Sequence, residues 1–214
     1  MQNLALFYDT ETTGLPLFKD PSEHPGQPHI VQLAAALVDL DTRETVASLD
    51  LIVRPDGWTI PDEVTEVHGI TTEYAMAVGV PEALALSLFL EMWGGRKRIA
   101  HNESFDARII RIAQHRAGEL EHDLERWKTG TAECTARLAT PILKLPPTAK
   151  MVAANRHHYK TANLSEAVLF FTGKPLENAH SALADVRGCM DVYFGIQDMR
   201  NGVPGALVDA ELAD

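Results

Sequence analysis

Apolar and polar positions along the chain predict a mixed α/β fold. The apolar run LALFY (4–8) is typical of a central strand that is covered on both faces. The segments 30–40 and 46–55 are joined by the turn sequence DTRE and predict a hairpin. Short apolar runs at 98–102 and 131–134 each precede a helical pattern. We therefore expect a five-stranded mixed sheet, its first three strands antiparallel, flanked by helices.

Helices are predicted where apolar residues recur every three or four positions and capping residues mark the ends. The expected helices begin near residue 72 and at Pro81, and span 105–117, 135–144, 163–171 and 181–198. Either Asn102 or Ser104 can cap the helix over 105–117. Residues 145–162 show no regular pattern, and residues 15–29, with four prolines, read as a loop.

Length and composition fit one soluble domain. The chain has 214 residues, of which 45% are hydrophobic and 23% charged, and we expect a domain over 1–200 with a short tail over 201–214. The N-terminal apolar run ends at Asp9, before a signal peptide could form, and no stretch approaches the ~18 apolar residues that span a bilayer. Cys134 and Cys189 lack zinc-ligand spacing, so we expect a cytoplasmic protein with reduced thiols and no membrane contact.

The net charge of −11 argues, by itself, against a nucleic-acid partner. The charge is unevenly distributed, however, because residues 134–165 contain no acid and five cations, which leaves −16 for the rest (−11 minus 5). The cations are Arg137, Lys144, Lys150, Arg156 and Lys160. This basic segment is either a strip that faces phosphates or a chance run on a solvated surface.

Four acids occupy positions where apolar side chains are expected. Asp9 and Glu11 follow the buried run LALFY and, being two residues apart on a strand, share one face. Asp106 lies on the apolar stripe of its helix, with apolar residues at +3, +4 and +7. Asp185 has apolar residues at +4, +7 and +11 in the last helix.

The placement of these acids indicates a bound cation. A helix dipole contributes only ~1 kcal/mol to a carboxylate in the first turn, whereas desolvating a lone carboxylate costs several kcal/mol. Two Mg²⁺ or Mn²⁺ ions would account for all four acids at once, since hard cations prefer carboxylate ligands. A capping or salt-bridged role remains the alternative for any single acid. His180, five residues before Asp185, could act as a general base from the segment that precedes the helix.

Three ordered motifs carry a resemblance to a known family: DTETTG (9–14), HNESFD (101–106) and HSALAD (180–185). The segment VHGIT (67–71) is similar to a further family stretch. The chain resembles the DEDDh 3′–5′ exonucleases, which have a ribonuclease H-like fold and include the proofreading epsilon subunit of bacterial DNA polymerase III. The resemblance extends over roughly residues 3–200.

The resemblance implies roles for residues in these motifs. Asp9, Glu11, Asp106 and Asp185 correspond to the metal ligands and His180 to the general base. The residues implied at the terminal nucleotide are Thr10, Gly14, Leu15, His68, Asn102 and Phe105. From the basic segment we expect Lys150, Arg156 and Lys160 to contact phosphates.

The leading hypothesis is a metal-dependent exonuclease that releases nucleoside monophosphates from 3′ ends of single-stranded or frayed DNA. The same chemistry on RNA stays open, because a carboxylate–metal centre does not itself select the sugar. A polymerase-associated proofreading or accessory subunit, acting in DNA replication or repair, is a second alternative. A phosphatase of small phosphoesters is a third. The long loop 15–29 and the absence of an added C-terminal domain favour a stand-alone nuclease.

Overall fold

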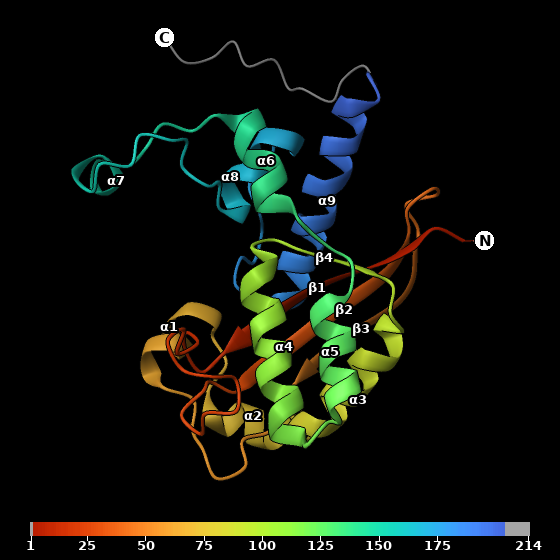
Figure 1. The fold of residues 1–214 in the computed structure, drawn as a ribbon, viewed down its shortest axis with the longest axis vertical. Helices are drawn as coiled ribbons and strands as arrows, with labels where there is room; N and C mark the ends of the chain where they lie inside the picture. Colours follow the sequence, from red (N-terminus) through yellow and green to blue (C-terminus); the bar gives the residue numbers. More distant parts are fainter. Residues whose placement is uncertain (1, 204–214) are drawn as a thin grey trace.

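The N-terminal apolar run forms β1 (Leu4–Thr12), which lies in the middle of a five-stranded sheet (Figure 1). The structure, a computed structural model, describes residues 2–203. The strand order is β3-β2-β1-β4-β5. β2 (Ile30–Asp39) pairs antiparallel with β1 and with β3 (Thr45–Ile52), while β4 (Lys97–Ala100) and β5 (Ala132–Cys134) continue the sheet in parallel. The predicted mixed sheet with three antiparallel strands is confirmed.

Nine helices occur within residues 2–203. They are α1 (Asp62–His68), α2 (Thr72–Val78), α3 (Glu82–Trp93), α4 (Glu103–Ala117), α5 (Glu121–Thr129), α6 (Thr135–Leu143), α7 (Ala149–Ala153), α8 (Leu164–Thr172) and α9 (Ala182–Arg200). None of the helices in this part of the chain is long and apolar enough to cross a membrane.

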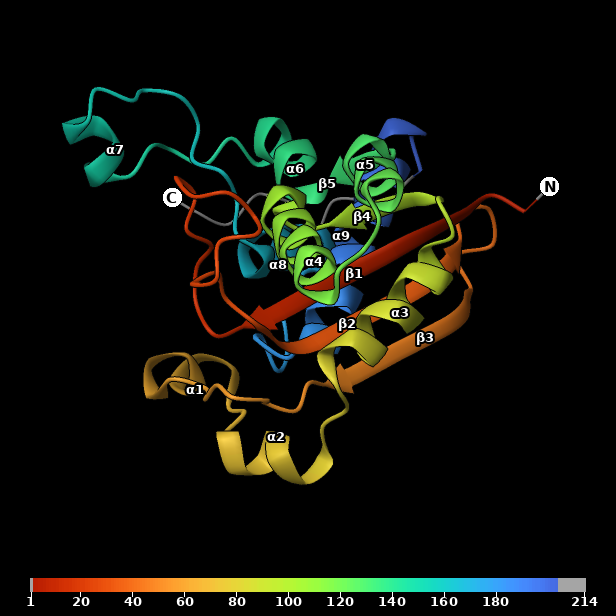
Figure 2. The same cartoon turned by 60° about the horizontal axis from the view of Figure 1, so that its bottom comes forward.

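The two faces of β1 are covered by different helices, as Figure 2 shows. Leu6 and Tyr8 pack with the buried side chains of α3, α4 and α5. Ala5 and Phe7 point the other way and pack with α9. Because side chains alternate along a strand, Asp9 and Glu11 continue the face of Phe7. The continuous apolar run therefore reflects burial on both faces, and it sets the two acids on the side of α9.

Helices α6, α8 and α9 form a further apolar cluster at one end of the sheet. Gly195 of α9 lies directly against Phe171 of α8, and a Cβ at this position would approach the Phe171 ring to 2.8 Å. The missing side chain thus lets the two helices come close together. The first turn of α9, which carries Asp185, is held beside the sheet by Ala182 and Val186, which pack with Ala5 and Phe7 of β1.

The sequence prediction missed α1, α5 and the short α7 inside the segment 145–162. It placed the start of α4 at residue 105, two residues after the observed start at Glu103, and of its two capping candidates Asn102 holds the N-cap position. Asn102 is the N-cap residue with a left-handed backbone (φ 65°), and its side chain makes no capping hydrogen bond. The tail from residue 201 was predicted to be short, and its residues 204–214 lie outside the described range.

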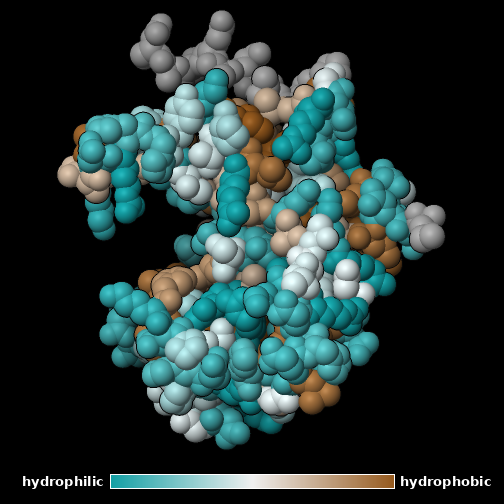
Figure 3. Space-filling view, in the orientation of Figure 1, coloured by the Kyte–Doolittle hydropathy of each residue, from teal (hydrophilic) through white to brown (hydrophobic). Residues whose placement is uncertain are grey.

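Residues 144–161, which we call the arm, leave the body after α6 and return before α8. The arm carries α7 at its outer end (Figure 1), where Thr148 accepts a hydrogen bond from the backbone N–H of Met151. Figure 3 shows the arm standing off the body above an open gap, with a mostly hydrophilic surface. Lys150 and Arg156 are both exposed.

Candidate active site

The four predicted acids come from three elements that meet at the carboxyl end of the central strand. Asp9 and Glu11 belong to β1, and Asp106 lies in the first turn of α4, directly after β4. Asp185 lies in the first turn of α9. Burial raises the pKa of Asp9, and the charges of Asp106, Asp185 and Glu11 raise it further, in keeping with four acids at one place.

Asp106 is held by the strand beside it. The backbone N–H and the hydroxyl of Thr10 both donate to Oδ1 of Asp106, at 3.0 and 2.7 Å. Both residues are buried. The hydroxyl of Thr10, which the resemblance places at the terminal nucleotide, is thus engaged with a carboxylate in this structure.

Glu11, Asp185 and His180 form the tightest group. One oxygen of each carboxylate and one ring nitrogen of His180 lie within 4.8 Å of one another. Asp9 and Asp106 are near neighbours of this group rather than members of it. The backbone N–H of His180 donates to Oδ2 of Asp185 at 3.2 Å, which ties the histidine segment to the helix. His180 itself is exposed and has a left-handed backbone (φ 68°).

Burial and mutual repulsion make the acid cluster a strong proton acceptor. Burial, and then the charges of Asp185 and Asp106, raise the pKa of Glu11 to about 8. Burial raises the pKa of Asp106 to about 7 although both hydrogen bonds from Thr10 oppose the shift. Burial also raises the pKa values of Asp9 and Asp185. Four carboxylates that repel one another in this way need a positive counter-charge to ionise together.

The donor set fits a divalent cation. Oδ1 of Asp185 is buried and has no hydrogen-bond partner within the described residues. An oxygen in that state is unfavourable unless a ligand satisfies it. The other candidate metal ligands are carboxylate oxygens, with no cysteine cluster beside them, and such sites suit Mg²⁺ or Mn²⁺.

His68 also faces the site. Its pKa is lowered by burial and by the nearby His180, with a partial offset from the carbonyl of Thr12. Nδ1 accepts a hydrogen bond from the backbone N–H of Ile70 at 3.1 Å, so the neutral ring carries its proton on Nε2. Nε2 is buried and has no partner among residues 2–203. The carbonyl of Thr12 is thus near the ring but makes no hydrogen bond with Nε2, so His68 presents a donor next to His180 that a ligand can engage.

The remaining residues predicted at the terminal nucleotide lie around the ends of β1 and β4. Gly14 and Leu15 follow β1, and the Leu15 side chain is 74% exposed. Asn102 is exposed at the start of α4, whereas Phe105 is half-buried and packs on the main core. Leu15 and Asn102 can thus meet a ligand directly, while Phe105 supports the first turn of α4.

The sequence analysis missed a buried ion pair below the site. Arg98 of β4 donates from Nε to Oε1 of Glu103 at 2.7 Å, and its guanidinium lies 4.2 Å from the ring centroid of Trp127. The hydroxyl of Tyr8 donates to the same carboxylate oxygen at 3.2 Å. Glu103 stands three residues before Asp106 inside the motif HNESFD, so the motif itself contained the signal. The pair fixes the first turn of α4 from below.

His101, the first residue of the same motif, links the site to the root of the arm. Its Nε2 lies 3.0 Å from the carbonyl oxygen of Ala162, and its Nδ1 lies 2.9 Å from Oγ1 of Thr135. A carbonyl only accepts, so Nε2 carries the proton and the hydroxyl of Thr135 donates to Nδ1. Burial lowers the pKa of His101, which favours this neutral form.

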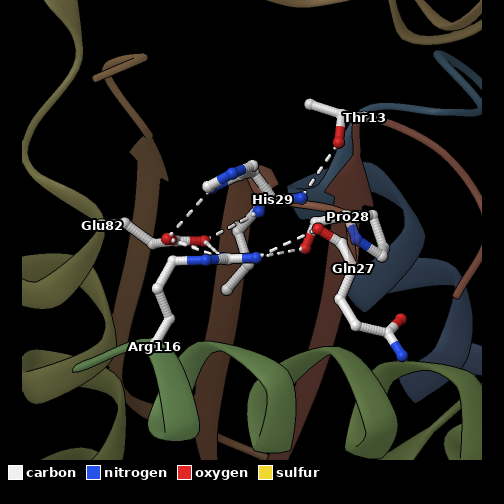
Figure 4. A network of polar contacts seen from close by, with 7 residues as sticks. Thr13, Gln27, Pro28, His29, Glu82 and Arg116 are labelled. Carbon is white, nitrogen blue, oxygen red and sulfur yellow. Dashed lines mark hydrogen bonds and ion pairs between the residues drawn. The ribbon is translucent and has the colours of Figure 1, made fainter. Parts of the chain in front are cut away.

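The loop 15–29 is anchored at its base by a network of polar contacts (Figure 4). Thr13 and His29 exchange two hydrogen bonds through the Thr13 hydroxyl and the backbone. Arg116 of α4 donates to both carboxylate oxygens of Glu82, each at 2.9 Å, and to the carbonyls of Gln27 and Pro28. The loop is therefore fixed against α3 and α4 rather than free.

The three cations expected to contact phosphates differ in their surroundings. Lys150 and Arg156 are exposed on the arm. Lys160 forms an ion pair with Glu166, the acid that ends the basic segment. Its charge is compensated in this structure, so of the three only Lys150 and Arg156 have no acidic partner among residues 2–203.

Comparison with known proteins agrees with this geometry. A model of the RNase_T family, described as an exonuclease, matches residues 6–193. Sequence comparison with curated proteins finds no match. The fold is similar to that of E. coli exonuclease I in complex with a dT13 oligonucleotide, with a TM-score of 0.71, 19% identity and coverage of 94% of this chain and 43% of that one.

Two further structures show the same likeness. The zinc-bound form of the E. coli exonuclease I–single-stranded DNA complex gives a TM-score of 0.69 at 19% identity, over 95% of this chain and 42% of that one. A product-bound structure of exonuclease I gives a TM-score of 0.69 at 19% identity, over 94% of this chain and 45% of that one. The chain thus spans less than half the length of these proteins. On the strength of the family match and of the four clustered acids with their histidine, the chain belongs to the RNase_T exonuclease family, as a member of the DEDDh 3′–5′ exonuclease type with a ribonuclease H-like fold.

Proposed function

We propose that the chain is a metal-dependent 3′–5′ exonuclease that releases nucleoside monophosphates from the 3′ ends of single-stranded or frayed DNA. The observation that carries this proposal is the convergence of four mutually repelling carboxylates, one with a buried and unpartnered oxygen. Such a cluster is unfavourable for the folded protein alone. It becomes favourable once the carboxylates hold cations.

Asp9, Glu11, Asp106 and Asp185 would hold two Mg²⁺ or Mn²⁺ ions. When bound, such ions lower the pKa of water and stabilise the charge that develops on the phosphodiester and the leaving oxygen. The chain sets the ligand positions beforehand. Thr10 holds Asp106 through two hydrogen bonds, and the ion pair of Arg98 with Glu103 supports the same turn of α4.

His180 would accept the proton of the attacking water. Its ring nitrogen lies within 4.8 Å of an oxygen of Glu11 and of Asp185, close enough to reach a water molecule at the acids. Its exposure gives the proton a path to solvent. The hydrogen bond from its backbone to Asp185 holds this segment at the site.

The terminal nucleotide would be positioned by residues around the acids. The unused Nε2–H of His68 can donate to a phosphate or sugar oxygen. The exposed side chain of Leu15 offers an apolar contact for a base, and Asn102 a polar one. The preference for single strands is supported by the similar fold of E. coli exonuclease I, which binds a dT13 oligonucleotide.

The arm would carry the strand toward the acids. A chain with a net charge of −11 repels DNA at long range, and the arm presents local positive charge at Lys150 and Arg156. Tyr159 on the arm is 48% exposed, so its ring is available to stack on a base. Lys160 would join them only after it leaves Glu166.

One assay tests the proposed function. Single- and double-stranded DNA and RNA oligonucleotides, labelled at either end, are incubated with Mg²⁺ and the products are resolved by length. We expect stepwise shortening from the 3′ end of single-stranded DNA, and none with Asp185→Asn or with a chelator. Faster shortening of RNA would assign the same chemistry to RNA. Cleavage by Asp185→Asn in the presence of chelator would contradict the proposed mechanism.

A further inference from the structure

A second cationic site lies on the outer side of α4, between the loop 15–29 and α5. It is a cavity of about 330 Å³ whose wall includes Ser22 of the loop and Arg108 and Arg111 of α4. Figures 1 and 2 show the loop running beside α4. No residue of this cavity belongs to the acid cluster or to the arm.

Arg108 and Arg111 have no acidic partner among the described residues. Arg108 donates from Nη2 to the backbone carbonyl of Asp20, and Arg111 donates from Nε to the hydroxyl of Ser22 at 3.1 Å. Both acceptors are neutral. Arg116, two turns further along the same helix, shows the opposite situation, because both oxygens of Glu82 compensate its charge.

The two arginines also destabilise each other. Burial and the charges of Arg108 and Arg98 lower the pKa of Arg111. Nε of Arg108 is buried and has no hydrogen-bond acceptor within residues 2–203. Arg108 and Arg111 are therefore two like charges one helical turn apart, and they repel each other. A bound anion would offset this repulsion and could accept a hydrogen bond from Nε of Arg108.

The rim of the cavity does not supply that anion. Glu125 is paired with Lys128 at 3.2 Å, and both are exposed. Glu23 lies 4.0 Å from His115. Glu121 is exposed at the opening, where water screens its charge. The excess positive charge therefore stays at the inner arginine pair.

The chemistry of the pair selects a phosphate. Two guanidinium groups and a hydroxyl offer several donors to one tetrahedral anion, and arginine is suited to phosphate recognition. The cavity is large enough for a phosphate with part of its nucleotide. Arg108 and Arg111 lie about 3 and 8 Å further along the α4 axis than Asp106, but on the opposite side of the helix, since successive residues are about 100° apart around its axis. A strand that ends at the acids would therefore pass over the first turns of α4 to bring a phosphate to the cavity.

We propose that this cavity binds a backbone phosphate of the nucleic acid, on the 5′ side of the nucleotide that is cleaved. The inference rests on the proposed function for the identity of the ligand. A phosphate there contacts Ser22 and the arginines that hold the loop, and so adds to the contacts that anchor the loop 15–29.

The test measures binding, without turnover. Metal-free protein in chelator is titrated with fluorescent single-stranded oligonucleotides of 3 and 15 nucleotides, at several salt concentrations, for wild type, Arg111→Gln, Arg111→Lys and Lys19→Gln. Lys19→Gln is the matched control, since it removes one exposed cation from the same loop outside the cavity. We expect Arg111→Gln to weaken binding of the longer strand about three- to tenfold and to reduce the log–log salt slope by ~0.7, with a partial return in Arg111→Lys.

A second experiment distinguishes the binding of a strand phosphate from the binding of free phosphate. Inorganic phosphate and chloride are compared at equal ionic strength for their effect on Tm. A rise of Tm with phosphate in wild type, absent in Arg111→Gln, together with the weaker strand binding, supports the proposal. Phosphate stabilisation without any change in strand binding would overturn it, because the cavity would then serve free phosphate alone.

Two further outcomes decide the matter. An equal loss of binding in Lys19→Gln and Arg111→Gln would overturn the proposal, since general charge would explain both. Because Arg111→Lys keeps the charge, it remains informative if Arg111→Gln folds poorly. Strand binding that depends on Arg111 in a protein without nuclease activity would contradict the proposed function and leave the phosphate site standing.

Discussion

Thr10 donates its backbone N–H and its hydroxyl to the same oxygen of Asp106. The contact joins the central strand to the first turn of α4 across 96 residues of sequence. It leaves the other carboxylate oxygen of Asp106 without a bond to Thr10. Two donors on one oxygen also favour the ionised carboxylate, against the effect of burial.

Thr10→Val should therefore lower activity without unfolding the protein. A hydrogen bond to a charged group contributes ~1.5–3 kcal/mol, so we expect kcat to fall about 10- to 100-fold. Loss of the hydroxyl also raises the pKa of Asp106 further, so the acid limb of the pH–rate profile should move to higher pH. Thr10→Ser keeps the hydroxyl and is the control. A Val variant with wild-type kcat and pH profile would show that the backbone bond alone suffices.

Stability of the metal-free protein should fall as the pH rises from about 4 to about 8. The folded-state pKa values of Asp106 and Glu11, about 7 and about 8, lie above the ~4 of an unfolded chain. Below pH 4 both states hold the protons and the contribution to stability is fully present. As the pH rises through the folded-state values, the folded protein must ionise a crowded cluster and the contribution is lost.

Asp9→Asn should remove part of this effect. We expect a higher Tm than wild type at pH 8 in chelator and little difference at pH 4. Mg²⁺ should raise the Tm of wild type at pH 8 far more than that of the variant. Thermal denaturation at both pH values, with and without Mg²⁺, measures this. A Tm of the metal-free wild type that rises between pH 4 and pH 8 would contradict the prediction.

The sequence predicted the acids because their signal is local. Each acid interrupts an apolar pattern. For Asp106 and Asp185 the interruption is visible in the spacing of apolar residues within one helix. It could not show that Lys160 pairs with Glu166, because the segment was defined by the absence of acids and Glu166 stands just beyond its end. The helix α5 was missed because only Leu124 and Trp127 are buried in it, too few for a clear periodic signal. The roles of His101 and Arg98 depend on partners that only the fold brings near.

His180→Ala should separate a general base from a metal ligand. If His180 is the base, kcat falls ~10²–10⁴-fold while the rise of Tm with Mg²⁺ is retained. If the ring instead binds the cation together with Glu11 and Asp185, both kcat and the rise of Tm with Mg²⁺ decrease. Activity assays and Mg²⁺ titrations of Tm on the same variant distinguish the two. His157→Ala on the exposed arm is the control for loss of a histidine.

The loop 15–29 should restrict access of duplex ends. The side chain of Gln27, only 2% exposed, accepts from the backbone N–H of Leu17 and donates to the carbonyls of Leu17 and Pro21. Gln27→Ala leaves these groups unsatisfied, at a cost of ~1–3 kcal/mol, and loosens the loop. We expect activity on duplex ends to rise relative to single strands. An unchanged ratio of the two rates, in a variant with a measurably lower Tm, would show that the loop does not control access.

The uncompensated charges of the arm should contribute to strand binding. Lys150 and Arg156 are exposed, so replacing both with Gln should raise KM for long oligonucleotides and flatten the salt dependence of binding by ~0.7 per lost contact. Lys160→Gln should have a smaller effect, because Glu166 already compensates that charge. Glu166→Gln should strengthen binding by releasing Lys160, while the amide oxygen of glutamine can still accept the capping hydrogen bond from the backbone N–H of Asn163. Saturated turnover should change little in all these variants, since none touches the acids. Equal salt slopes for wild type and the double variant would mean that the arm is a solvated surface, and the strand would then have to reach the acids by another path.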